Sequence, residues 1–374
     1  MKELAINLMR FRKINGQTQQ VVAEAAGISR VAYRNIEKGE STPRKSTLDA
    51  LAKVLNISVM QLLEPLPRLK SLRLRANSER TTQEIAQSEQ LILRVAHWLS
   101  DFNDLEALLE KKDNFALPKI NALSPPEVVA ENIREEWLGS QSKKDCISNL
   151  CELLENAGIK LFLDDFKLNS FFGLSVGFAD GGPAIAINTR KNISVERQIF
   201  SMAHELGHLL LHEESYENST QSISNDDQEH EADRFAAAFL MPQAAFVEEW
   251  NENRGLHWID AVLKTKRHFK VSYQMILHQL VDMGKAKSPD IYKKFRADYE
   301  IRYGKKLHWK EEPKLQIGDE PYQLDPLDLM EDRLGSLVRD ALDQEYITTS
   351  RAAEILNIGI EEMRERMKSW KVIS

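Results

Sequence analysis

The chain has 374 residues, more than one hydrophobic core usually serves, so we expect two or three domains. With 42% hydrophobic and 29% charged residues and only 16 Gly and 12 Pro, collagen-like and low-complexity classes are excluded. Two cysteines cannot form a disulfide framework, no apolar run is long enough to span a membrane, and the charged N-terminus does not look like a signal peptide. We therefore expect a cytoplasmic protein without a membrane partner.

The net charge of -7 is an average over two unlike parts of the chain. Residues 1–80 hold 15 Lys and Arg against 7 Asp and Glu, a net charge of +8, and the remaining residues carry -15. Such asymmetry indicates a basic module attached to an acidic body, with a chance cluster as the alternative.

Residues 1–66 are predicted to form five short helices. Apolar residues at helical spacing define each helix, and residues with strong terminal preferences mark where it begins or ends. The expected N-caps are Thr18, Ser29, Ser46 and Ser58, and the expected stops are Gly16, Gly27 and Gly39.

The second and third of these helices, joined by a tight Ala-Gly-Ile-Ser turn, are typical of a helix-turn-helix, whose second helix enters the major groove of DNA. Arginine pairs with guanine, asparagine pairs with adenine, and a helix N-terminus can meet a phosphate. The candidate DNA contacts are Gln19, Ser29, Arg30, Val31, Arg34, Asn35, Lys38, Arg44 and Lys45. The alternative is a five-helix packing domain that does not bind DNA.

This segment resembles the XRE family of phage-repressor-like DNA-binding domains over about 60 residues. The resemblance is carried by Thr18-Gln19, Ala26-Gly27-Ile28-Ser29, Ile36-Glu37-Lys38-Gly39, Leu48, Leu51, Ala52 and Leu55. It implies a double-stranded DNA operator as partner. Because XRE domains usually bind as dimers, it also implies a homodimer.

Residues 67–125 are predicted to connect the basic module to a second domain. The sequence LKSLRLRA over 69–76 alternates apolar and basic residues, which indicates a strand or an extended linker. Its basic face either extends the positive patch or is solvated. We expect a long helix over about 80–112 and a loop with two prolines over 113–125.

A further helical stretch is expected over 126–158. It contains Cys146 and Cys151, which are five positions apart and are expected to be buried thiols rather than a metal pair. Residues 159–189 then alternate apolar runs with an Asp-Gly-Gly-Pro turn signal, which predicts a small sheet of about three strands.

Residues 199–212 read IFSMAHELGHLLLH and contain His204-Glu205-x-x-His208 on an apolar, helical background. Histidines at i and i+4 project from one helix face, so both imidazoles can reach one metal ion, and Glu205 can deprotonate a metal-bound water. His212 lies a further turn along, too far for the same ion in an unbroken helix, and is expected to cap the helix. A histidine pair without metal is the alternative.

A catalytic zinc takes three protein ligands, so we expect the third from a second helix. After the polar segment 213–228, the chain reads QEHEADRFAAAFLMP. Its predicted buried stripe includes alanines small enough for the first helix to approach closely: Ala232, Phe235, Ala236, Phe239 and Leu240. The candidate ligands at its start are Glu229, His230 and Glu231, and the sequence pattern does not separate them.

The motifs HELGHLLLH and EHEADRFAAAFLMP, with Glu196-Arg197-Gln198 and Phe200 before them, resemble the ImmA/IrrE family of zinc metallopeptidases. The resemblance covers about residues 130–290. It implies a Zn²⁺ site formed by His204, His208 and Glu231, with Asp233 as a supporting group. The implied chemistry is metal-assisted peptide hydrolysis, in which Glu205 takes a proton from water and passes it to the leaving amine.

An oxyanion donor and a substrate-docking element complete the predicted site. Tyr216 and His230 are the candidate oxyanion donors. The strand PAIAINTR is expected to dock the substrate as an added strand. The acidic loop between the two motifs is expected to be a solvated connector, and a gate over the cleft is the alternative.

The C-terminal part is predicted to be mainly helical. Two helices over 255–286 complete the peptidase domain, and the polar segment 287–325 is expected to be a linker or lid. The module at 326–374 is helix-turn-helix-like, with Thr349 capping one helix and Gly359 preceding the next. Acidic residues at 340, 343 and 345 favour a structural or protein-binding role over DNA binding.

The expected fold class is mainly α with a small β-sheet (α+β): a five-helix helix-turn-helix domain at 1–66, a zincin-like domain at 126–286 and a helical extension. The predicted function is a DNA-binding, zinc-dependent endopeptidase that regulates transcription by cleaving a repressor or another regulator. The alternative is an antitoxin, or an autoregulating repressor of a toxin–antitoxin-like operon. Its zincin body would then bind a partner such as a toxin, with little or no proteolysis.

Overall fold

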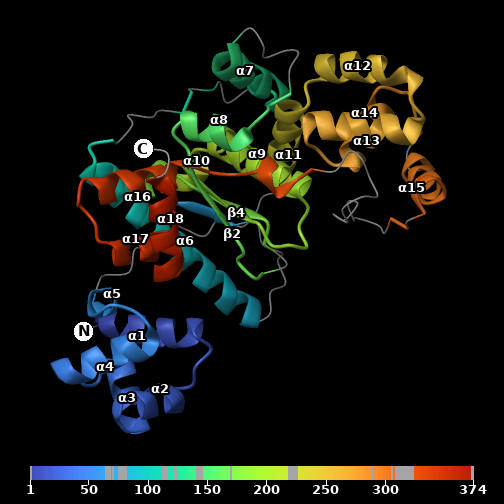
Figure 1. Cartoon of the computed structure of the whole chain (residues 1–374). Helices are drawn as coiled ribbons and strands as arrows, with labels where there is room; N and C mark the ends of the chain where they lie inside the picture. The colour runs from blue at the N-terminus through green and yellow to red at the C-terminus, as the bar shows by residue number, and fades with distance from the viewer. Residues whose placement is uncertain are drawn as a thin grey trace. The chain divides into compact units, whose positions relative to one another are not determined.

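The structure is a computed structural model of the chain (Figure 1). It describes residues 2–63, 69, 71–74, 82–111, 117–118, 120, 124–139, 146–168, 171–217, 226–287, 290–304, 306–307 and 324–371. The chain divides into two compact units, Met1–Arg68 with Arg80–His97, and Leu69–Glu79 with Trp98–Ser374. The fold class is the expected one, since helices predominate and there is one small mixed sheet.

The first unit contains the five predicted helices: α1 (Lys2–Ile14), α2 (Gln19–Ala25), α3 (Arg30–Glu37), α4 (Lys45–Leu55) and α5 (Val59–Leu63). The side chains of Thr18 and Ser29 accept hydrogen bonds from backbone N–H groups in the first turns of α2 and α3, as predicted. The expectation for α4 was wrong by two positions, because Arg44 rather than Ser46 precedes its first turn. Apolar side chains from all five helices form one core.

The long helix α6 (Thr82–Leu108) confirms the prediction for 80–112. Its residues up to His97 belong to the first unit, and those from Trp98 onward belong to the second.

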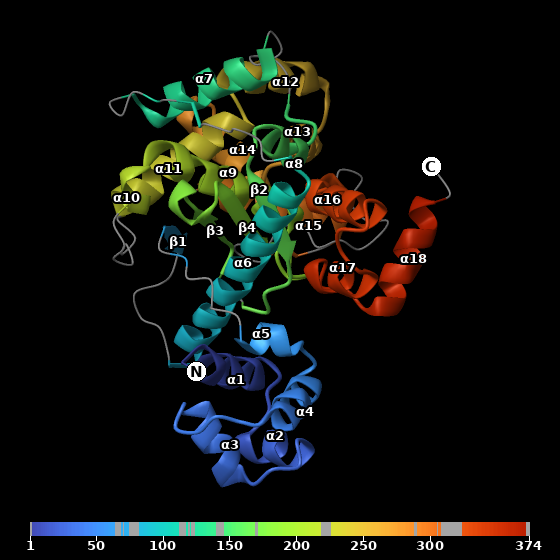
Figure 2. The same cartoon turned by 90° about the vertical axis from the view of Figure 1, so that its left-hand side faces the viewer.

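The second unit contains a four-stranded sheet with the order β1-β3-β4-β2 (Figure 2). The strands are β1 (Leu72–Leu74), β2 (Lys160–Asp164), β3 (Gly173–Val176) and β4 (Ala184–Asn188). β3 runs antiparallel to β1 and to β4, and β2 runs parallel to β4. The three strands predicted between 159 and 189 are confirmed. Of the two structures expected for 69–76, a strand or an extended linker, the strand forms at Leu72–Leu74 and joins the same sheet.

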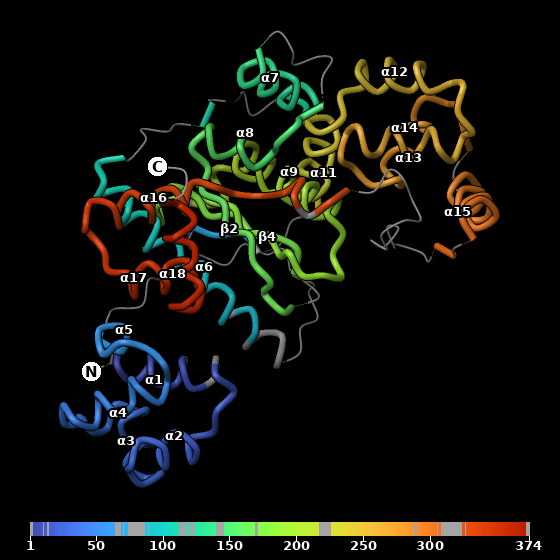
Figure 3. The backbone as a smooth tube through the Cα atoms, in the orientation of Figure 1, coloured from blue at the N-terminus to red at the C-terminus, as the bar shows by residue number. Residues whose placement is uncertain are grey.

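Helices cover this sheet, and two of them position the candidate site. α9 (Val195–Leu211) contacts β3 and β4, and α11 (Asp226–Leu240) packs against α9 and α7 (Figure 3). The other helices of the unit are α7 (Pro126–Leu138), α8 (Leu150–Asn156), α10 (Glu214–Glu217), α12 (Gln243–Glu252), α13 (Trp258–Phe269), α14 (Tyr273–Asp282), α15 (Asp290–Tyr303), α16 (Arg333–Asp343), α17 (Thr349–Ile355) and α18 (Ile360–Trp370). No helix among the described residues is long and apolar enough to cross a membrane.

Three local expectations differ from the structure. Helix α15 forms where a linker or lid was predicted, because Phe295 and Tyr299 lie four residues apart and are both buried in the core of the unit. Cys146 precedes α8 instead of lying in a helix, and it is half-buried. Thr348, not Thr349, caps α17, because its side chain accepts from the backbone N–H of Arg351.

Glu331, just before α16, should make stability depend on pH. Burial raises the pKa of Glu331 to about 7, and the nearby Glu155 charge adds to the shift. In the unfolded chain the pKa of this carboxyl group is near 4.5. Above that pH the group ionises when the protein unfolds but stays protonated in the folded protein. The free energy of unfolding therefore falls as pH rises from about 4.5 to 7. We expect Glu331→Gln to be about 1–3 kcal/mol more stable than the parent at pH 8 and to lose that advantage at pH 4.5.

Urea denaturation of the full chain at both pH values measures this difference. The exposed Glu365 provides the matched control, Glu365→Gln, which should follow the parent at both pH values. A Glu331→Gln advantage that is the same at both pH values would contradict the prediction.

Candidate metal centre and DNA-contact surface

The HELGH motif lies on α9, and its functional side chains are buried. Ser194 caps the helix by accepting a hydrogen bond from the backbone N–H of Arg197. His204, Glu205 and His208 are only 2–3% exposed. His212 forms the C-cap of the helix, as predicted, and its backbone N–H donates a hydrogen bond to the carbonyl oxygen of His208.

Close packing brings α11 to this face of α9. Gly207 permits the approach, since a Cβ atom there would lie 3.0 Å from Phe235 and 3.2 Å from the Cα of Ala232. The prediction that small residues allow the two helices to pack closely is therefore confirmed. As a result, the first turns of α11 lie against the histidines of α9.

Three ligand atoms meet between the two helices. The Nε2 atoms of His204 and His208 are 3.0 Å apart, and the carboxylate of Glu229 lies 3.4 Å from the first and 3.3 Å from the second. Zinc–ligand bonds of about 2.0–2.2 Å at a tetrahedral ion put neighbouring ligand atoms about 3.3–3.6 Å apart. The distances to Glu229 match this spacing, although Oε2 is the atom near His204 and Oε1 is the atom near His208, and the two imidazole nitrogens are slightly closer together. This trio is the candidate metal set of the described residues.

The carboxylate that lies with the two histidines is Glu229, whereas the family resemblance implied Glu231. Glu231 bonds His212, with 2.9 Å between its Oε2 and the ring Nε2 of that histidine, and it is not part of the metal set. At about 100° per residue, positions 229 and 231 lie about 200° apart around α11, so only one of them can face the ion. His230 is exposed between them.

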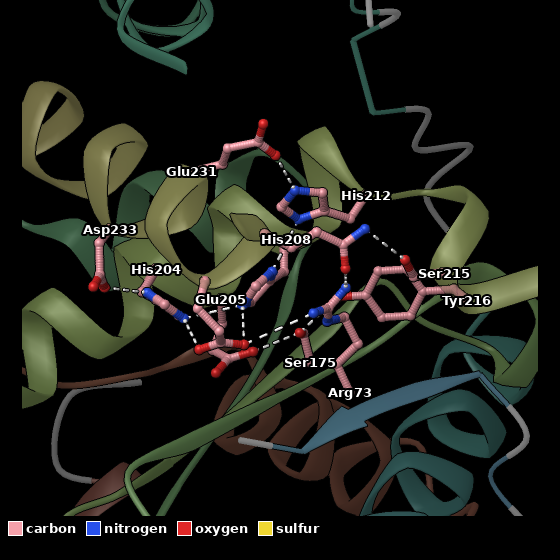
Figure 4. Close-up of polar contacts among 12 residues, drawn as sticks. Arg73, Ser175, His204, Glu205, His208, His212, Ser215, Tyr216, Glu231 and Asp233 are labelled. Atoms are coloured by element: carbon pink, nitrogen blue, oxygen red, sulfur yellow. Dashed lines mark hydrogen bonds and ion pairs between the residues drawn. The ribbon is translucent and has the colours of Figure 1, made fainter. Parts of the chain in front are cut away.

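The candidate general base, Glu205, accepts a hydrogen bond from the first of two linked hydroxyl groups (Figure 4). Ser175 on β3 donates to Glu205 at 2.6 Å, and its Oγ is 2.7 Å from the hydroxyl of Tyr216. Tyr216, a candidate oxyanion donor, therefore reaches Glu205 through Ser175. Asp233 lies 2.7 Å from Nδ1 of His204, which is the supporting position expected for it.

Charges in the site are coupled through burial and hydrogen bonds. Burial lowers the pKa of His208 to about 3, which keeps this ring neutral. Burial also acts to lower the pKa of His204, but hydrogen bonds with Asp233 and Glu229 outweigh it and raise the pKa to about 9. Burial raises the pKa of Glu205. Because metal ligation needs a neutral imidazole, zinc would compete with a proton at His204.

Comparisons with known proteins match two parts of the chain, the N-terminal helix-turn-helix domain and the domain that carries the HELGH motif. Residues 8–62 match the helix-turn-helix family model, and residues 154–281 match the model for the IrrE N-terminal-like domain. The chain belongs to the helix-turn-helix regulators and carries an IrrE N-terminal-like domain.

Two curated relatives resemble the helix-turn-helix domain alone. The control protein C.SmaI of Serratia marcescens is 42% identical over 60 residues, which are 16% of this chain and 71% of the relative. An uncharacterized HTH-type transcriptional regulator of Bacillus subtilis, YazB, is 42% identical over 55 residues, 15% of this chain and 80% of the relative. No solved structure matches the chain.

The helix-turn-helix domain presents most of the predicted DNA contacts to solvent. Exposed side chains come from Ser29, Arg30, Val31, Arg34, Lys38, Arg44 and Lys45. Gln19 and Asn35 are half-buried, and the Gln19 amide donates to Glu37 at 3.4 Å. Arg12 holds Glu37 with two hydrogen bonds of 2.8 and 2.9 Å, which fixes α3 against α1.

In the second unit, sequence reasoning missed Arg73 and Ser175. Arg73 on β1 was expected to be solvated or to extend the basic patch, but it is 4% exposed. Its guanidinium donates to Gln228 at 2.6 Å and lies 3.8 Å from Glu229. Ser175 is the polar residue between buried Leu174 and Val176, and a lone hydroxyl in such a strand is a signal that could have identified it.

The strand expected to dock substrate is not available for that purpose. β4 lies inside the sheet and is paired with β2 on one side and β3 on the other, so it has no free edge. The edge of β3 that faces away from β4 is occupied by β1 of the same chain. Residues 218–225, half of the polar segment 213–228, lie outside the described residues.

Proposed function

We propose that the protein is a DNA-binding, zinc-dependent endopeptidase that regulates transcription by cleaving a repressor or another regulator. The observation that carries the proposal is the set of buried His204 and His208 with half-buried Glu229, and Glu205 lies beside the two histidines on α9. The helix-turn-helix family of residues 8–62 supports DNA binding. We further propose that the protein acts in the cytoplasm as a homodimer on its operator.

His204, His208 and Glu229 would hold Zn²⁺, which supplies a Lewis acid and a water of lowered pKa when it is bound. Glu205 would accept a proton from the attacking water and pass it to the leaving amine. Ser175 keeps the Glu205 carboxylate oriented through its 2.6 Å hydrogen bond. Burial excludes bulk water from these groups, which strengthens their electrostatic effect.

Metal removal gives the direct test of this proposal. The full chain, loaded with one equivalent of zinc, is mixed with the regulator encoded beside its gene, and cleavage is followed by mass spectrometry. We expect a defined cut that disappears when a chelator removes the metal and returns when zinc is restored. A protein that binds zinc but leaves that regulator intact in both states would contradict the proposed target.

Arg30, at the first position of α3, is expected to read a base in the operator. Its side chain is exposed at the end of the helix that would enter the major groove. We expect Arg30→Ala to weaken operator binding by about 1–3 kcal/mol and to relax the preference at one base pair. Lys38→Ala is the matched comparison. The loss of a phosphate contact should weaken binding to all DNA sequences alike and should lower the salt dependence of the affinity.

Titration of labelled operator variants with each full-length variant at several salt concentrations separates the two roles. An Arg30→Ala variant with the affinity of the parent protein would exclude this base contact.

A further inference from the structure

Two residues beside the metal set have no part in the proposed function so far. His212 ends α9 and Glu231 lies in the first turns of α11, and both are outside the set of three ligands. Figure 4 shows them in a line that begins at His208 and points away from Glu205. This line is the basis of the inference, which rests on the proposed zinc site.

The line consists of two consecutive hydrogen bonds. Nδ1 of His208 lies 3.0 Å from Nδ1 of His212, and Nε2 of His212 lies 2.9 Å from a carboxylate oxygen of Glu231. His208 and His212 are buried, whereas the side chain of Glu231 is 47% exposed. The line therefore connects a buried imidazole to a carboxylate at the protein surface.

The carboxylate fixes the direction of both hydrogen bonds. A carboxylate only accepts, so Nε2 of His212 donates to Glu231. A neutral imidazole has one N–H group, which leaves Nδ1 of His212 as an acceptor. Nδ1 of His208 must then carry the proton of the second hydrogen bond. In that tautomer, Nε2 of His208 presents its lone pair on the side where Nε2 of His204 and Glu229 meet.

We infer that His212 and Glu231 are positioning residues, which hold His208 in the tautomer that binds the metal. His204 obtains the same support from one residue, since Asp233 accepts directly from its Nδ1 at 2.7 Å. The two ligand histidines are thus held by carboxylates of the same helix, α11. His208 needs an intervening imidazole because its Nδ1 faces His212 and not α11 directly.

Zinc affinity of the full-length protein tests this inference without an assay of proteolysis. Competition with a fluorescent zinc chelator gives the dissociation constant of the parent protein, His212→Leu, His212→Gln and Glu231→Ala. We expect His212→Leu to bind zinc about 10–100-fold more weakly, because Nδ1–H of His208 loses its acceptor. His212→Gln should recover most of the affinity, since its carbonyl oxygen replaces that acceptor. Glu231→Ala should weaken binding about 3–10-fold.

Two controls separate positioning from folding. Glu213→Ala changes an exposed glutamate outside the line of hydrogen bonds and should bind zinc like the parent protein. Circular dichroism of each metal-free variant reports its folding. If His212→Leu does not fold, the comparison of Glu231→Ala with Glu213→Ala decides, because both positions lie at the surface.

Nitrogen-15 spectra of labelled histidines in the zinc-loaded protein report the tautomers. We expect a proton on Nδ1 of His208 and on Nε2 of His212. The opposite tautomer at His212, or a zinc affinity of His212→Leu within twofold of the parent, would overturn the inference, as would His212→Gln binding as weakly as His212→Leu. Failure of the parent protein to bind zinc would instead reject the proposed function.

Discussion

Glu205→Gln is expected to retain zinc and to lose cleavage of the target regulator by about 10²–10⁴-fold. The substitution keeps the shape of the side chain and an oxygen that accepts from Ser175, but it removes the group that takes a proton. Glu205 is not one of the three candidate ligand residues, so the zinc content of the protein should not change. Metal analysis and the initial rate of cleavage, measured on the same full-length preparation, check both parts.

The same variant separates the two functions that the sequence allows. A protease must lose its cellular effect with Glu205→Gln, whereas an antitoxin or repressor that uses the domain only for binding must keep it. Arg30→Ala is the counterpart, since it impairs the DNA module and leaves the metal centre untouched. A strain in which Glu205→Gln regulates normally and Arg30→Ala does not would establish the non-catalytic alternative.

Features determined by neighbouring residues could be predicted from the sequence. Thr18 and Ser29 cap their helices through backbone groups three residues ahead, and the i, i+4 spacing of His204 and His208 already places both on one helix face. His212 was correctly expected to end its helix. In each case the partners are within one or two turns, so no knowledge of packing is needed.

Features that depend on distant partners were not predicted. Arg73 has an ordinary alternating context, and its contact with Gln228 is 155 positions away. Ser175 acquires its role only because β3 passes beside α9. Helix α15 was missed because charged residues surround Phe295 and Tyr299, and their burial depends on packing against α13 and α14. Such roles follow from tertiary contacts rather than from local patterns.

The choice between Glu229 and Glu231 also depends on tertiary contacts. The buried stripe of α11 includes Ala232, Ala236 and Leu240, and one step of three residues back from Ala232 reaches Glu229. Glu231 lies farther around the helix and bonds His212 instead. Glu231 is likewise one step of four residues before the buried Phe235, so the contacts with α9 are needed to tell the two carboxylates apart, and the family resemblance alone favoured Glu231.

Glu229→Ala is expected to weaken zinc binding on the order of 100-fold or more, because it removes a direct ligand where loss of a supporting group costs about 10–100-fold. It also leaves Arg73 without the carboxylate 3.8 Å away, which adds an uncompensated buried cation to the site. Glu231→Ala is the matched control on the same helix, and its loss should remain within about tenfold because Glu231 acts only through His212. Chelator competition on the two full-length variants measures both losses. If Glu231→Ala loses more affinity than Glu229→Ala, the third ligand is Glu231, and α11 must rotate by nearly half a turn about its axis to give Glu231 the place of Glu229.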